Sequence, residues 1–135
     1  MAQSLTTPFP STFRNTRTNE LIDGQTLAPV FKKIHQHKTI KVMQIGDSHV
    51  KGNILPRALG STLERYFPRM EFTYYGMNGA WARRFYEQDM INRVVAERPD
   101  LVIVSFGTNE AHGNTIDERA HAETMKTLTD RISER

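Results

Sequence analysis

The chain contains no cysteine, which excludes disulfide bonds, thiolate zinc sites and a cysteine nucleophile. No apolar run approaches the roughly 18 residues needed to span a bilayer, so no membrane span is expected. The first residues, Met-Ala-Gln-Ser-Leu-Thr-Thr-Pro, lack the charged and apolar regions of a signal peptide. The lack of signal-peptide features predicts a cytoplasmic protein, unless an expression start has replaced a signal peptide that was removed.

No charge of one sign dominates, because 18 Lys and Arg oppose 15 Asp and Glu, and no run of five or six like charges occurs. Nucleic-acid binding is indicated by basic residues gathered on one face, so no nucleic-acid partner is expected. The five histidines show no His-Glu-x-x-His spacing, and we predict no metal site. The phosphate-binding patterns Gly-x-Gly-x-x-Gly and Gly-x-x-x-x-Gly-Lys are also missing.

The length of 135 residues and a hydrophobic content of 38% suit one domain with one core. Residues 1–26 are rich in Thr, Asn, Ser and Pro, and we expect them to form an irregular arm. Residues 27–135 are expected to form the domain. Arg83 and Arg84 are expected in a solvated loop.

Apolar periodicity and breaker residues predict helices at 27–37, 55–67, within 86–97 and after 114, and strands at 39–45, 71–75 and 101–105. Alternating strands and helices indicate βαβ units, a parallel sheet and an α/β fold. The continuous apolar run at 101–105 predicts a strand buried on both faces. Thr115 and Glu118 match a capping box for the last helix.

Two helices have predicted inner faces. The expected inner residues of the second helix are Leu55, Ala58, Leu59 and Leu63, and those of the last helix are Ile116, Ala120, Met125, Leu128 and Ile132. Gly60 lowers helix propensity by about 1 kcal/mol against alanine, so it is interpreted as a point of close packing on the sheet.

Each predicted strand ends in a polar loop that contains glycine. These loops are Gly46-Asp47-Ser48-His49, residues 76–80 and residues 106–113. The carboxyl ends of parallel strands share one edge of a sheet, where ligands bind. Acyl transfer by a serine needs a nucleophile, a base and donors for the oxyanion. Ser48 supplies the nucleophile, and the donors are the backbone N–H groups of Ser48 and Gly79 with the side-chain amide of Asn109.

Three motifs carry a resemblance to a known family. Gly-Asp-Ser at 46–48, Asn-Gly-Ala at 78–80 and Gly-Thr-Asn-Glu at 107–110 resemble the first blocks of the SGNH (GDSL) hydrolases, with gaps of about 30 residues. The family letters map onto Ser48, Gly79 and Asn109, and the resemblance covers roughly residues 39–113. The particular residues of these motifs look most like those of a bacterial branch related to peptidoglycan O-acetylesterases.

The resemblance implies a flavodoxin-like, three-layer αβα fold of the SGNH-hydrolase type with strand order 2-1-3-4-5. It also implies no cofactor and, for this branch, a periplasmic or extracellular location. The chain has only the first three strands, and the family's catalytic Asp-x-x-His is missing. We therefore expect the N-terminal portion of a longer hydrolase, truncated after the third strand and its helix, or one that a separate C-terminal fragment completes. Little or no turnover is expected from this chain alone.

The local histidines are poor substitutes for the missing base. His49 adjoins the nucleophile on a turn, where a neighbouring side chain usually points elsewhere, and a base must reach the serine oxygen at about 2.6–3.2 Å. His112 lies in the third loop and is the least implausible stand-in. His121 is expected to be solvated on the last helix.

The predicted function is a serine esterase that removes acetyl or another short acyl group from an acylated small molecule or glycan. Asp47, His49, Trp81 and His112 are predicted to line the substrate site, and Trp81 with Tyr75 to form a wall on which a sugar stacks. Lipase, thioesterase and polysaccharide deacetylase activities remain open. The alternative is a non-catalytic, flavodoxin-like module that binds carbohydrate or a partner.

Overall fold

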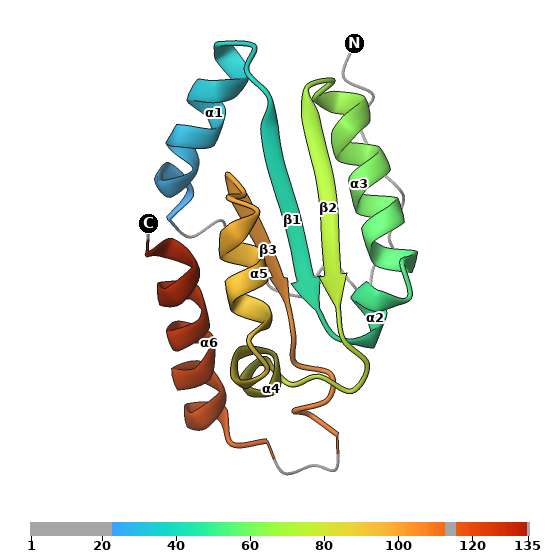
Figure 1. Ribbon diagram of the computed structural model, residues 1–135, viewed down its shortest axis with the longest axis vertical. Coiled ribbons are helices and arrows are strands. Elements are labelled where there is room, and N and C mark those ends of the chain that lie inside the picture. The colour runs from blue at the N-terminus through green and yellow to red at the C-terminus, as the bar shows by residue number, and fades with distance from the viewer. Residues whose placement is uncertain (1–22, 113–115, 135) are drawn as a thin grey trace, which may run out of the picture.

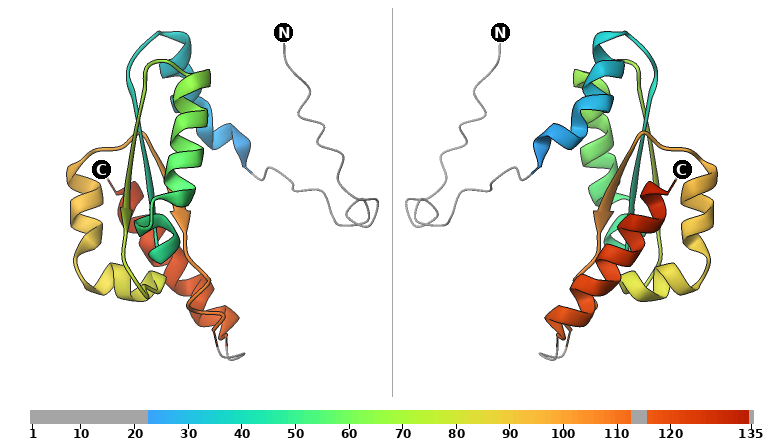
Figure 2. Two further views of the ribbon diagram at one scale, coloured as in Figure 1. Left: turned by 90° about the vertical axis from the view of Figure 1, so that its right-hand side faces the viewer. Right: turned by 90° about the vertical axis from the view of Figure 1, so that its left-hand side faces the viewer.

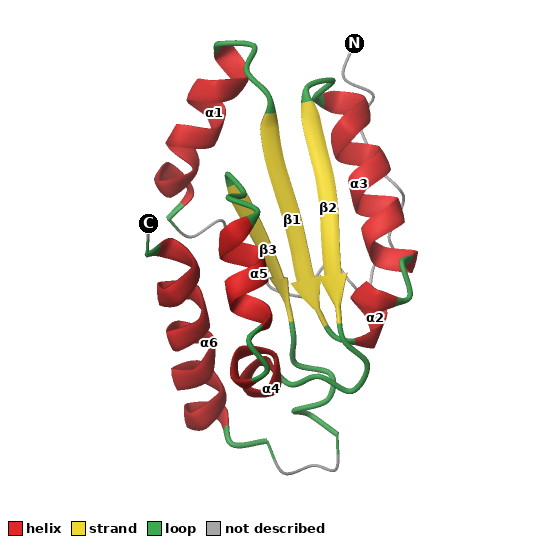
Figure 3. Ribbon diagram, viewed as in Figure 1, coloured by secondary structure: helices red, strands yellow, loops and turns green. Residues whose placement is uncertain are grey.

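The computed structural model describes residues 23–112 and 116–134, and its centre is one parallel sheet. The strands are β1 (Ile40–Gly46), β2 (Met70–Gly76) and β3 (Leu101–Ser105), in the order β2-β1-β3 (Figures 1 and 3). The predicted parallel α/β sheet with order 2-1-3 is confirmed. Residues 1–22 of the expected arm lie outside the described residues. Gly24–Leu27 form a short 3₁₀ helix, η2.

Helices cover both faces of this sheet. They are α1 (Ala28–His35), α2 (Ser48–Lys51), α3 (Ile54–Tyr66), α4 (Ala82–Glu87), α5 (Met90–Ala96) and α6 (Glu118–Ser133). Figure 2 shows α1 and α3 on one side of the strands and α5 on the other. The described residues therefore form the predicted flavodoxin-like, three-layer αβα arrangement.

The central strand β1 divides the core into two clusters, because successive side chains of a strand point to opposite faces. Ile40 and Val42 pack with residues of α1, α3 and β2. Met43 and Ile45 pack with the buried residues of the other layer, which are Ala82, Phe85, Ile91, Val94 and Leu128. Leu128, a predicted inner residue of the last helix, is thus confirmed as a core residue.

The predicted inner face of α3 is partly wrong. Leu55 is 49% exposed and Ala58 is exposed, while Pro56 and Gly60 are buried against the sheet. The close packing expected at Gly60 is confirmed, because a Cβ there would lie 2.5 Å from Cδ1 of Phe72 on β2. The absence of a side chain at position 60 lets α3 approach β2.

Gly60→Ala is expected to lower the free energy of unfolding by about 1–2 kcal/mol, because overpacking at Phe72 outweighs the gain in helix propensity. Urea denaturation of the variant measures this. Ser61→Ala, at the exposed neighbouring position, is the control and should change stability by less than about 0.5 kcal/mol. A Gly60→Ala protein as stable as the unmodified chain would contradict the prediction.

The helix expected within residues 86–97 is confirmed as α5, and a separate helix that the sequence did not predict, α4, precedes it. The chain enters the left-handed conformation at Asp89 (φ 61°), which ends α4 and starts α5. Arg83 and Arg84 lie in α4 rather than in a loop, although both are exposed. An aspartate tolerates this conformation better than most residues, but its type alone does not reveal the break.

Two further predictions near the carboxyl end are corrected. Strand β3 is only half-buried along its length, because it is an edge strand of the described sheet. Helix α6 is capped by Asp117, whose side chain accepts a hydrogen bond from Ala120 N at 3.0 Å. The capping box is therefore wrong: Glu118 is the first helical residue, and Thr115 lies outside the described residues. Ile116 and Ala120 are exposed.

Candidate active site

The three strand-end loops begin level with one another, because Gly46 of β1 is paired with both Gly76 and Ser105. Gly46 has no room for a side chain, since a Cβ there would lie 2.4 Å from the carbonyl oxygen of Ser105. A Cβ on Gly76 would lie 2.0 Å from the backbone nitrogen of Lys51. These two glycines thus let the chain after β1 turn directly into helix α2.

Ser48 is the first residue of α2 and is exposed. The preceding Asp47 caps this helix and is only 2% exposed. Its Oδ1 accepts a hydrogen bond from the backbone N–H of His49 at 2.9 Å and lies 3.0 Å from Nδ1 of the same residue. Asp47 therefore fixes both the backbone turn that presents Ser48 and the imidazole of His49.

The second loop is attached to the first through its backbone. Met77 N donates a hydrogen bond to the carbonyl of Gly46 at 3.1 Å, and Ala80 N donates to the carbonyl of Met77 at 3.2 Å. Between them, Gly79 adopts φ +63°, a conformation that favours glycine, and it is exposed. Gly79 is thus the turn residue of a loop held beside the start of α2.

Two hydrogen bonds join the third loop to the second loop and to the start of α4. Asn109 Nδ2 donates a hydrogen bond to the carbonyl of Ala80 at 3.0 Å, and Ala82 N donates to Oε1 of Glu110 at 2.8 Å. Trp81 lies between these attachments. An amide nitrogen carries two hydrogens, so the second N–H of Asn109 is left without a partner among the described residues. It can serve as a hydrogen-bond donor to a ligand.

Glu110 is a functional candidate that the sequence analysis missed. Its side chain is only 8% exposed, and its Oε1 lies 3.6 Å from Nδ1 of His121 on α6. The expectation that His121 is solvated is wrong, because its side chain is only 25% exposed. The signal available in the sequence was the place of Glu110, directly after Asn109 at the end of a strand; its burial depends on α6.

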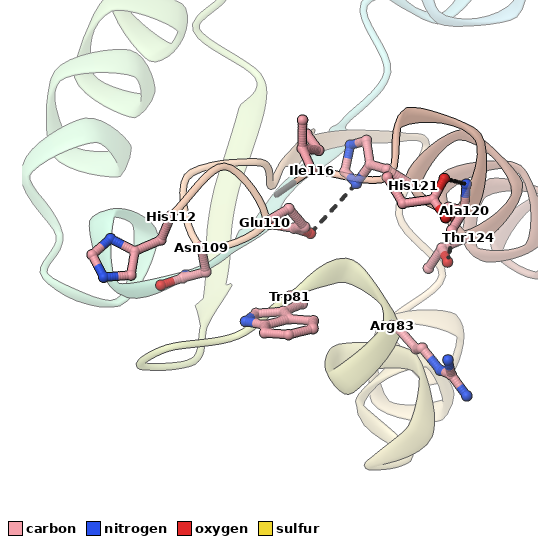
Figure 4. A pocket seen from close by; sticks show the side chains of 10 residues that line it. Trp81, Arg83, Asn109, Glu110, His112, Ile116, Ala120, His121 and Thr124 are labelled. Carbon is pink, nitrogen blue, oxygen red and sulfur yellow. Dashed lines mark hydrogen bonds and ion pairs between the residues drawn. The ribbon is translucent and has the colours of Figure 1, made fainter. Parts of the chain in front are cut away.

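A pocket of about 240 Å³ opens where the second and third loops meet α6 (Figure 4). Its lining residues are Trp81, Arg83, Asn109, Glu110, His112, Ile116, Asp117, Ala120, His121 and Thr124. Three of the predicted site residues, Trp81, Asn109 and His112, are thus brought together here. Tyr75 does not line the pocket and packs against the core instead, so the predicted wall of Trp81 and Tyr75 is not formed.

Ser48, the expected nucleophile, has no described base bound to it. No hydrogen bond joins the Ser48 hydroxyl to another residue within 23–112 and 116–134. The Nδ1 atom of His49 faces Asp47, and His112 is exposed. An acyl transfer at Ser48 therefore needs a proton acceptor in addition to these contacts.

No group of three or more His, Asp or Glu side chains in the described ranges is arranged to hold a metal ion. None of the described helices combines the length and apolar character needed to cross a membrane.

No protein-family model matches the sequence, and no curated protein is similar to it. Among solved structures, that of the acetyl xylan esterase AlAXEase is similar to this chain, with a TM-score of 0.58 and 20% sequence identity. The match covers 70% of this chain and 53% of the esterase chain, so this chain spans about half the length of that protein. The protein therefore shares its α/β fold with about half of an acetyl xylan esterase.

Proposed function

We propose that this chain is part of a serine esterase of the SGNH type that removes acetyl or other short acyl groups from a carbohydrate. The observation that carries the proposal is the convergence of the three motifs. The second loop is bonded to the first through Met77 and Gly46, and the third is bonded to the second through Asn109 and Ala80. The fold shared with an acetyl xylan esterase supports the reaction class and suggests the carbohydrate.

In the proposed reaction, Ser48 Oγ attacks the ester carbonyl carbon and forms a tetrahedral intermediate. The backbone N–H groups of Ser48 and Gly79 and the free N–H of Asn109 stabilise its oxyanion. A base takes the proton from Ser48 and gives it to the departing sugar oxygen, which leaves an acyl-serine. Water then attacks the acyl group and gives a proton to the base, which passes it to Ser48 Oγ as the bond to the acyl carbon breaks and the carboxylic acid leaves.

The base in this scheme is a histidine outside the described contacts. The shared fold covers only 53% of the esterase chain, and we propose that a C-terminal segment or fragment supplies the imidazole. Free imidazole is then expected to replace it in part. Of the local histidines, His49 is turned to Asp47, which leaves its Nε2 as the alternative acceptor.

The test is acetate release from acetylated xylotetraose, with and without added imidazole, against the heat-unfolded chain as a blank. We expect slow, saturable release that imidazole accelerates. Release that is no faster than the blank under both conditions contradicts the proposal for this chain. The substrate is an alkyl ester rather than an activated aryl ester, because imidazole alone attacks activated aryl esters and would release acetate without the protein.

A second candidate function is a module that binds carbohydrate without turnover. It is favoured by the absence of a bond between the Ser48 hydroxyl and any described base, although the donor groups are in place. Binding of acetylated xylotetraose without acetate release, even after a C-terminal segment is restored, would favour this function over catalysis.

A further inference from the structure

We propose that the pocket between Trp81, Glu110 and His121 binds one neutral pyranose ring of a glycan. This inference rests on the proposed function for the identity of the ring as the sugar that carries the ester. Within that function it assigns a substrate class and a subsite to the pocket. We call it the Trp81 pocket (Figure 4).

Trp81 is a flat apolar surface on a fixed backbone. It is the only tryptophan of the chain and is 54% exposed, whereas its neighbours Ala80 and Ala82 are both fully buried. The carbonyl of Ala80 and the N–H of Ala82 are bonded to Asn109 and Glu110. An exposed aromatic face of this kind suits the apolar C–H face of a sugar ring, and little conformational entropy is lost when its backbone is already fixed.

The polar groups of the pocket include both donors and acceptors. The second N–H of Asn109 is a donor, and Thr124 keeps acceptor capacity after donating to the carbonyl of Ala120 at 2.8 Å. Oε2 of Glu110 is buried without a hydrogen-bond partner among the described residues, which is unfavourable unless a donor reaches it. Sugar hydroxyls act as donors and acceptors at once, so they match this mixed set.

The charges and the size of the pocket limit the charge and the size of the ligand that it can bind. Arg83 is paired with Glu87 at 2.7 Å, and the lining also contains the carboxyl groups of Glu110 and Asp117, so no positive excess favours a phosphate or a carboxylate. The volume of about 240 Å³ lies below the range of roughly 300–1,000 Å³ that is usual for drug-sized ligands. One sugar ring of a chain suits this space, and Asn109 then lies at the border between the ring and the oxyanion site.

The test uses the single tryptophan as its probe. Xylotetraose is titrated into Ser48→Ala protein, in which binding is separated from turnover, and the emission of Trp81 is recorded. We expect a saturable change. Ligand-observed NMR then compares variants: Trp81→Ala and His121→Ala should each bind about tenfold more weakly. Tyr66→Ala, which removes an aromatic side chain that is 59% exposed and outside the pocket, should bind as the parent does.

Two results overturn the inference. One is the absence of saturable emission change and of an NMR binding signal with folded protein. The other is equal weakening in Tyr66→Ala and in the pocket variants. Circular dichroism establishes folding, and Trp81→Phe replaces Trp81→Ala if the latter unfolds. Acetate release that depends on Ser48 without sugar binding rejects the pocket alone, whereas sugar binding without acetate release rejects only the esterase.

Discussion

Ser48→Ala is expected to lower the imidazole-accelerated rate of acetate release from acetylated xylotetraose to the rate of the blank. Alanine removes the oxygen that attacks the ester, and removal of a nucleophile abolishes the covalent route rather than weakening it. The side chain of Ser48 is exposed at the start of α2 and makes no described hydrogen bond, so its loss should leave the fold intact. Binding of the oligosaccharide should also persist.

Ser61→Ala is the matched control for this prediction. Ser61 is also an exposed helical serine, on α3, and its hydroxyl donates only to the carbonyl of Ala58. Its replacement should leave acetate release unchanged. If Ser48→Ala and Ser61→Ala release acetate at the same imidazole-accelerated rate as the parent, another group performs the reaction and the assignment of Ser48 fails.

The sheet was predictable from the sequence because its signals are local. Apolar runs ending in glycine-containing loops predicted all three described strands to within one residue at each end. Pairing is also constrained, since Gly46 must pass close to Ser105 and Gly76 close to Lys51. The parallel direction of the strands followed from the alternation of strands with helices, whereas their order followed from the resemblance to the SGNH hydrolases.

The errors concern burial, which depends on partners distant in the sequence. Leu55 fits an apolar stripe yet is 49% exposed, because Pro56 and Gly60 face the sheet instead. Strand β3 reads as a fully buried strand, but as an edge strand of the described sheet it is only half-buried. The periodicity of a segment shows which of its positions are apolar, but it does not show which other elements of the fold pack against them.

The candidate site was predictable only in part for the same reason. Motifs placed Ser48, Gly79 and Asn109 at one sheet edge, which the parallel register supports. The contact between Glu110 and His121 was missed because it joins the third loop to α6 across a gap of 11 positions. A buried glutamate resembles a solvated one in sequence, and only the packing of α6 reveals it.

Asn109→Ala is expected to lower kcat for acetate release by about 100- to 1,000-fold, the usual effect of losing one oxyanion donor. KM should change little, because the donor acts mainly in the transition state. The substitution also removes the hydrogen bond to the carbonyl of Ala80. Asn109→Asp removes the same two hydrogen bonds without changing the size of the side chain. An ionised carboxylate cannot donate a hydrogen bond and repels the oxyanion, so this variant should lower kcat at least as much as Asn109→Ala does.

Asn92→Ala is the matched control, since Asn92 is an exposed asparagine on α5 that bonds to surface residues. It should leave both kcat and KM unchanged. A rise in KM with unaltered kcat in Asn109→Ala would show that the amide positions substrate in the ground state, as a contact to the sugar rather than to the oxyanion. Because Asn109 borders both, the division of its effect between kcat and KM measures how far the sugar and the ester share one set of contacts.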